Sequence, residues 1–112
     1  MSEPNQLQIT SRKKDSAAYG AGNWGYFPFS ETFEAYQNLS PAGFGLYLML
    51  MRDKPHFQRD LYRVEYEKLT GRKRTTYYNA LQELKDKGYL VQVSGTAWNF
   101  FPDSQFKKPD SN

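Results

Sequence analysis

Three adjacent basic residues, Arg72, Lys73 and Arg74, stand directly before a run of hydroxyl and amide side chains in this 112-residue chain. Guanidinium and ammonium groups bind phosphate oxygens. The amides of Asn79 and Gln82 have a different chemistry, because each can pair with an adenine edge through two hydrogen bonds. The segment therefore combines groups that bind an anionic backbone with groups that recognise a base.

The same three cations lie where a helix is expected to begin. Apolar residues recur at the helical spacing i, i+3, i+4 and i+7, at Tyr77, Ala80, Leu81 and Leu84. This pattern predicts a helix over residues 74–87, which Gly88 ends. A cation near a helix N-terminus opposes the macrodipole by about 0.3–1 kcal/mol. A bound phosphate would explain why the chain places its densest positive charge there.

Candidate DNA-contacting residues divide into three sets. The expected phosphate contacts are Arg63, Arg72, Lys73, Arg74 and Lys85. The expected base-recognising residues face away from the apolar stripe and are Thr75, Thr76, Tyr78, Asn79 and Gln82. A basic arm that reaches a minor groove would use Arg12, Lys13 and Lys14. Ordinary solvated charges and exposed helix residues remain the alternative interpretation of all three sets.

Charge and composition limit the classes of function. The net charge is +3, and residues 59–79 alone hold six basic against three acidic residues, so the whole excess lies there. The chain has no cysteine and one histidine, His56, which excludes disulfides and Cys- or His-rich metal sites. There is no nucleophile motif or phosphate-binding glycine loop, and Glu65 and Glu67 do not share a helix face. We therefore expect a non-enzymatic protein without a cofactor.

No apolar run is long enough for a membrane span and no hydrophobic leader precedes the domain, so the expected location is the cytoplasm.

Three regions are expected along the chain. Residues 1–22 are polar and read as a flexible basic arm, residues 23–102 form the folded domain, and residues 103–112 form a polar tail. The aromatic segment 23–30 is expected to be extended, and residues 31–38 to form a short helix or an irregular connection.

The next predicted helix starts at Ser40, a favourable N-cap, with Pro41 in the first helical position. Its apolar residues form two stripes, Phe44, Tyr47, Leu48 and Met51 on one, and Leu46, Met49 and Leu50 on the other. A helix that is apolar on nearly all sides is buried or contacts a second subunit. This favours a homodimer or a side-by-side assembly on repeated sites.

The order of the remaining elements defines the predicted fold. A very short strand in residues 56–62 precedes a short helix over 63–69 with Val64 and Leu69 inward, and Gly71 makes a sharp turn. After the helix at 74–87, residues 89–94 and 97–102 form a β-hairpin. Two helices joined by a short glycine-containing turn are a helix-turn-helix, and the hairpin corresponds to a wing. The predicted class is therefore α+β, mainly α with a small hairpin.

With these motifs, the chain resembles the winged helix-turn-helix domains of replication and accessory proteins in Gram-positive phages, plasmids and conjugative elements. The matching stretches are "WGYFPFS", "LSPAGFGLYLMLM" and "LTGRKRTTYYNALQELKDKGYLV", within residues 24–102. The resemblance implies sequence-specific binding of double-stranded DNA, with residues 74–87 as the recognition helix. It implies a role at an origin or operator in replication, conjugative transfer or transcription control, with a relaxase or replication initiator as a candidate partner.

The hairpin departs from this family, because residues 89–102 contain no Lys or Arg. Trp98 and Phe100 are instead expected to pack into the core or against another subunit. The uncharged hairpin favours an alternative function, a protein–protein interaction module built on the same scaffold.

Overall fold

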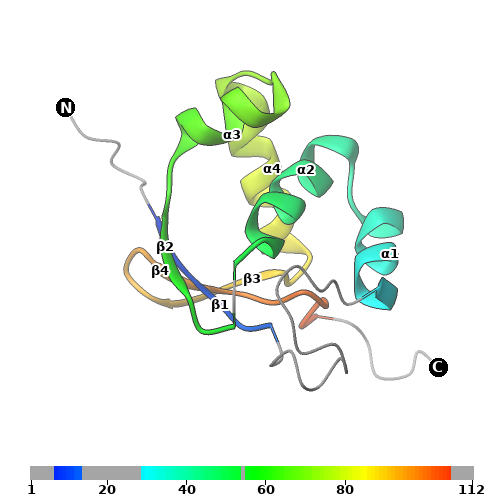
Figure 1. Ribbon diagram of the computed structural model, residues 1–112, viewed down its shortest axis with the longest axis vertical. Coiled ribbons are helices and arrows are strands. Elements are labelled where there is room, and N and C mark those ends of the chain that lie inside the picture. Colours follow the sequence, from blue (N-terminus) through cyan, green and yellow to red (C-terminus); the bar gives the residue numbers. More distant parts are fainter. Residues whose placement is uncertain (1–6, 14–28, 54, 107–112) are drawn as a thin grey trace.

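Four helices and one four-stranded sheet account for most of the residues that the computed structural model describes, which are 7–13, 29–53 and 55–106 (Figure 1). The strands are β1 (Leu7–Ser11), β2 (Gln58–Leu61), β3 (Leu90–Ser94) and β4 (Ala97–Phe100). The helices are α1 (Phe29–Asn38), α2 (Pro41–Met51), α3 (Arg63–Thr70) and α4 (Arg74–Asp86). In Figure 1 the sheet lies below α3 and to the left of α1. The α+β class expected from the sequence is confirmed.

The sheet is larger than the predicted hairpin and has the strand order β2-β1-β4-β3. β1 pairs antiparallel with β2 and parallel with β4, and the β3–β4 hairpin is antiparallel. The assignment of residues 7–11 to a flexible arm is therefore wrong. Leu7, Ile9 and Ser11 are buried and alternate with more exposed residues, so this strand has the period-two pattern of a half-buried sheet.

Helix α2 begins as predicted and lies at the centre of the core. The Ser40 hydroxyl accepts a hydrogen bond from the Gly43 N–H at 3.1 Å, and Pro41 occupies the first helical position. Five large α2 side chains are buried within the chain, at Leu46, Tyr47, Met49, Leu50 and Met51. Both predicted stripes are thus largely covered without a second subunit, which removes the observation behind the expected homodimer.

Helix α4 is anchored on α2 through its inner face. Its predicted apolar stripe is confirmed, since all four side chains are buried: Tyr77, Ala80, Leu81 and Leu84. Beside this stripe, the Glu83 carboxylate accepts hydrogen bonds from the backbone N–H and hydroxyl of Ser40, at 2.9 and 2.7 Å. A Cβ added to Gly43 would lie 2.1 Å from the nearer Glu83 oxygen. The absence of a side chain at Gly43 therefore lets α4 pack against the start of α2.

Helix α3 turns a different face inward from the one predicted. Val64 and Leu69 are 52% and 60% exposed, whereas Tyr66 is fully buried. The Tyr66 hydroxyl donates a hydrogen bond to the Ala42 carbonyl at 2.9 Å. Burying one large ring with a satisfied hydroxyl decides the rotation of this eight-residue helix, so the prediction for Val64 and Leu69 is wrong.

Two further boundaries differ from the expected ones. Phe29 and Ser30 begin α1 instead of ending an extended segment, while residues 23–28 lie outside the described residues. The first part of the predicted C-terminal tail packs on the domain, because the Gln105 N–H donates to the Gly88 carbonyl at 2.9 Å. Residues 107–112 lie outside the described residues. No helix within the described ranges is long and apolar enough to cross a membrane.

Candidate nucleic-acid interface

A short turn joins α3 to α4 and projects the basic residues from the domain. Gly71 has φ +73°, in the left-handed region, and its N–H donates to the Glu67 carbonyl at 2.8 Å. Thr70 braces the turn, since its hydroxyl donates to the Tyr66 carbonyl at 2.7 Å and accepts from the Arg72 N–H at 3.2 Å. The predicted glycine turn is confirmed. An added Cβ at Gly71 would meet nothing within 4 Å, so the left-handed φ, and not lack of space, is the reason that glycine suits this position.

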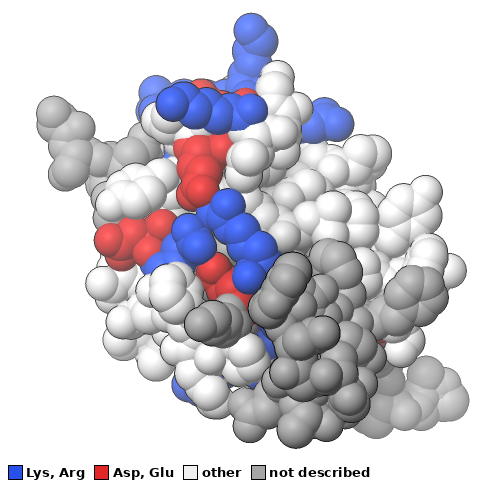
Figure 2. Space-filling view, in the orientation of Figure 1, with Lys and Arg blue, Asp and Glu red and all other residues white. Residues whose placement is uncertain are grey.

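Positive charge gathers at this turn. Four exposed cations, which we call the basic turn cluster, are Lys68, Arg72, Lys73 and Arg74. Figure 2 shows Lys and Arg side chains at the top of the molecule, over the place where α3 and the start of α4 lie in Figure 1. The two acidic residues of α3 pair with other cations, Glu65 with Arg52 at 2.5 Å and Glu67 with Arg63 at 2.6 Å. Within the described part of the chain, no ion pair neutralises the cluster.

The charge of one cluster residue, Arg72, influences the buried tyrosine of α3. Burial raises the pKa of the Tyr66 hydroxyl, and the positive charge of Arg72 partly opposes this shift. Arg72 therefore acts electrostatically on the inner face of α3 while its own side chain is exposed to solvent.

The five predicted phosphate contacts do not form one group. Arg72, Lys73 and Arg74 lie together in the basic turn cluster, but the Arg63 side chain is 20% exposed and ion-paired with Glu67. Lys85 lies eleven residues along α4 from Arg74, about 16 Å away along the helix axis. Sequence reasoning missed Lys68, although its place in the last turn of α3, one turn before Arg72, was a usable signal.

The predicted base-recognising residues divide in the same way. Thr75, Asn79 and Gln82 are exposed and stand at i, i+4 and i+7, so they form one outer stripe of α4. The Gln82 amide donates to the Asp86 carboxylate at 2.9 Å, which leaves its carbonyl oxygen to accept a hydrogen bond. Thr76 and Tyr78 are half-buried beside this stripe.

Tyr78 connects the outer stripe to both the cluster and the core. The Arg74 guanidinium lies over its ring, 5.9 Å from the centroid. The ring centroid of Tyr77 is 5.0 Å from that of Tyr78 in an edge-to-face arrangement. Tyr78 therefore contacts the basic turn cluster through Arg74 and the core through Tyr77.

The predicted arm residues are attached to the sheet. The Arg12 N–H donates to the Phe100 carbonyl at 2.8 Å, and the Lys13 ammonium donates to the Met51 carbonyl at the end of α2, at 2.8 Å. Burial lowers the pKa of Lys13, with the Asp53 carboxylate opposing that shift. A free arm is thus the wrong description of Arg12 and Lys13, because backbone pairing and the helix C-terminus hold them. Lys14 lies outside the described residues.

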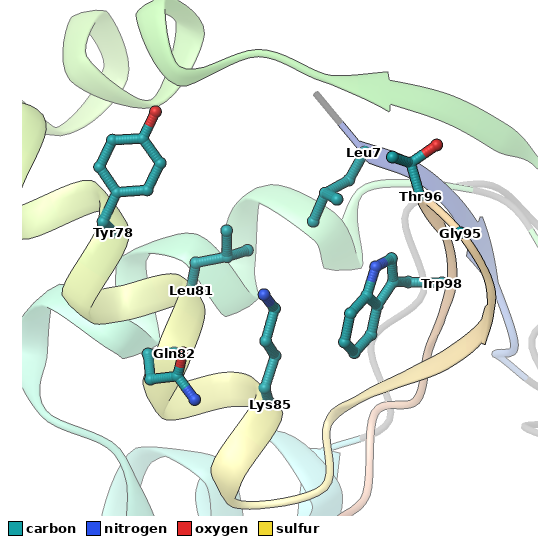
Figure 3. A pocket seen from close by; sticks show the side chains of 8 residues that line it. All are labelled: Leu7, Tyr78, Leu81, Gln82, Lys85, Gly95, Thr96 and Trp98. Atoms are coloured by element: carbon teal, nitrogen blue, oxygen red, sulfur yellow. The ribbon is translucent and has the colours of Figure 1, made fainter. Parts of the chain in front are cut away.

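A groove of about 350 Å³ separates the second half of α4 from the turn of the hairpin (Figure 3). Its walls come from β1, α4 and the hairpin, at Leu7, Tyr78, Leu81, Gln82, Lys85, Gly95, Thr96 and Trp98. The Lys85 ammonium lies over the Trp98 ring, 4.7 Å from its centroid. Sequence reasoning did not assemble this groove, because its parts come from three segments that are far apart in the chain.

The hairpin residues pack inward to different degrees. Phe100 is fully buried, and its ring centroid lies 5.5 Å from that of Tyr47, so the expected core packing of Phe100 is confirmed. Trp98 packs against the core cluster but is only half-buried. One side of the hairpin therefore completes the core and the other borders the groove.

The described residues contain no group of three or more His, Asp or Glu side chains that could hold a metal ion. No protein-family model, curated protein or solved structure matches this chain.

Proposed function

We propose that the chain is a non-enzymatic, sequence-specific double-stranded DNA-binding protein with a winged helix-turn-helix fold. In this proposal α3 and α4 are the helix-turn-helix and the β3–β4 hairpin is the wing. One observation carries the proposal: four cations without an ion pair among the described residues border the start of a helix whose outer stripe is polar.

The cluster and the helix would act on different parts of DNA. An α-helix fits the major groove of B-DNA, which is about 12 Å wide. With α4 in that groove, the basic turn cluster would bind phosphates at its edge, and these contacts would position the protein without specifying sequence. Thr75, Asn79 and Gln82 would then face base edges, where an amide can recognise adenine.

The biological role in this proposal follows the resemblance of the sequence. A protein of this kind in a mobile genetic element marks an origin or operator, in replication, conjugative transfer or transcription control. It would act in the cytoplasm and recruit a relaxase or a replication initiator.

Salt dependence of duplex binding tests the proposal. Each phosphate contact contributes a slope of about −0.9 to log K against log salt. Four contacts from the cluster predict a slope of about −3.6, which is an affinity loss of about 150-fold between 50 and 200 mM NaCl. Fluorescence anisotropy with a labelled mixed-sequence duplex measures this slope. No binding at 50 mM NaCl, or binding that salt leaves unchanged, would refute the proposal.

A protein-interaction module is the second candidate function. The exposed apolar residues Val64 and Leu69 of α3 favour it, with Tyr62 directly before the helix, as does the hairpin without basic residues. An apolar contact would depend little on salt, so the same titration with a candidate protein partner separates the two functions.

A further inference from the structure

The groove between α4 and the hairpin contains groups that phosphate binding does not require. Two of its lining side chains are aromatic, Tyr78 and Trp98, and two are aliphatic, Leu7 and Leu81. Polar groups stand among these apolar surfaces, and Figure 3 shows the Lys85 side chain extending between α4 and Trp98. A flat apolar surface with an adjacent cation suits a planar ligand that carries a negative charge.

We propose that this groove binds one unpaired nucleotide of the DNA, with the base stacked on Trp98 and a neighbouring phosphate bound by Lys85. The inference rests on the proposed DNA-binding function and extends it to a site that lies beside the outer stripe of α4. In this site the uncharged hairpin contributes to DNA binding through the Trp98 ring, without any Lys or Arg.

Lys85 would change partners when the nucleotide enters. Its ammonium now lies over the Trp98 ring, 4.7 Å from the centroid, and no carboxylate pairs with it in the described part of the chain. Stacking of a base on an aromatic ring contributes more than a cation–π contact at a partly exposed site. The exchange is favourable for a second reason, because the ammonium gains a phosphate in place of the ring.

The rim of the groove offers one hydrogen-bond acceptor for the edge of a base. The Gln82 amide gives its N–H to Asp86, so its carbonyl oxygen remains to accept a hydrogen bond. Thr96 lies on the opposite rim, and Figure 3 shows its hydroxyl pointing away from the groove. An added Cβ at Gly95 would meet nothing within 4 Å, so a nucleic-acid backbone can approach the turn closely.

An unpaired base suits the groove better than a paired one. In a complete duplex both faces of each base are covered by stacking, and extruding a base requires breaking that stacking and pairing. A base without a partner is easier to extrude. The groove should therefore favour a duplex with an unpaired base, such as one in a partly opened origin.

Fluorescence of Trp98 reports directly on the groove. Only two tryptophans are present, so a Trp24→Phe background leaves Trp98 as the sole indole. The probes are a fully paired duplex, the same duplex with one extra unpaired thymine, and free thymidine monophosphate. We expect the unpaired thymine to quench Trp98 and to tighten binding about tenfold relative to the fully paired duplex.

Matched variants separate stacking from folding. Trp98→Leu should abolish the preference for the unpaired base, and Trp98→Phe should retain part of it. Phe57→Leu is the control, because Phe57 also has a cation near its ring, Arg59 at 5.5 Å from the centroid, but is exposed and does not line the groove. Thermal melting of each variant excludes loss of the fold as the cause.

The outcomes distinguish this inference from the DNA-binding proposal. Salt-dependent binding to the paired duplex, with no gain and no quenching from the unpaired thymine, would overturn the groove site and leave the proposed function standing. Quenching by thymidine monophosphate at the oligonucleotide concentration would assign the groove to free nucleotides and also overturn it. Failure to bind any duplex would overturn the proposed function itself.

Discussion

Removing two arginines from the basic turn cluster should halve the salt dependence of DNA binding. The perturbation is the double substitution Arg72→Ala with Arg74→Ala. Both side chains are exposed and neither has a carboxylate partner among the described residues, so their loss should leave the fold intact. Arg74 does lie over the Tyr78 ring, at 5.9 Å, but a single exposed cation–π contact contributes about 0.5–1 kcal/mol.

The magnitude follows from the number of cations at the turn. Each phosphate contact contributes about −0.9 to the slope of log K against log salt, so the loss of two contacts out of four changes this slope from about −3.6 to about −1.8. Between 50 and 200 mM NaCl the variant should then lose about 12-fold in affinity, where the parent chain loses about 150-fold. The loss should be equal on any duplex sequence, because phosphate contacts do not specify bases.

The assay is an anisotropy titration at four salt concentrations, with a mixed-sequence duplex. Arg52→Ala serves as the control, because Arg52 is a partly exposed arginine whose charge Glu65 already offsets at 2.5 Å. It should leave the slope within error of the parent value. If the double variant keeps the parental slope, or if Arg52→Ala changes the slope by as much per charge, the basic turn cluster is not the phosphate-binding surface.

Three further substitutions and one control, Gln82→Ala, test the residues that hold α4 and its preceding turn in place and the recognition of bases. Leu81→Ala should lower the free energy of unfolding by about 2–5 kcal/mol in urea denaturation, because it opens a core cavity, whereas its neighbour Gln82→Ala should change it by less than about 0.5 kcal/mol. Gly71→Ala should lower the free energy of unfolding by about 1–2 kcal/mol, because φ +73° is unfavourable for a residue with a Cβ; an unchanged urea midpoint would contradict this. Asn79→Ala should weaken binding by about 1–3 kcal/mol on a selected cognate site and much less on random duplex; equal losses on both would show that Asn79 does not recognise a base.

The sequence predicted the elements that have a long or chemically specific pattern. Helix α4 was predicted within one residue at its C-terminal end, because thirteen residues allow its apolar stripe to repeat. The start of α2 was predicted because Ser40 and Pro41 each act through local geometry. The turn at Gly71 follows from the same local reasoning.

The failures came from short elements whose structure depends on distant partners. β1 has five residues and lies in a polar terminal segment, so its alternation was overlooked, and its strand character depends on pairing with both β2 and β4. The rotation of α3 was mispredicted because a helix of eight residues offers only two apolar positions besides the decisive Tyr66.

The candidate site was predictable only where its residues are neighbours in sequence. Arg72, Lys73 and Arg74 remain together because they are consecutive. The i, i+4 spacing of Arg63 and Glu67 could have indicated that Arg63 is paired. The contact between Lys85 and Trp98 had no such signal, because it forms only when the hairpin folds back beside α4.

Mapping of duplex binding onto the backbone amides by nuclear magnetic resonance tests the central claim most directly. A mixed-sequence duplex is titrated into isotope-labelled protein at low salt, and the change in each amide shift is measured. The proposal predicts the largest changes at the turn and along the outer stripe of α4, from Gly71 to Gln82, with little change in α1. Changes concentrated on α1, or on the exposed apolar residues Val64 and Leu69 with the amides of α4 unmoved, would contradict it.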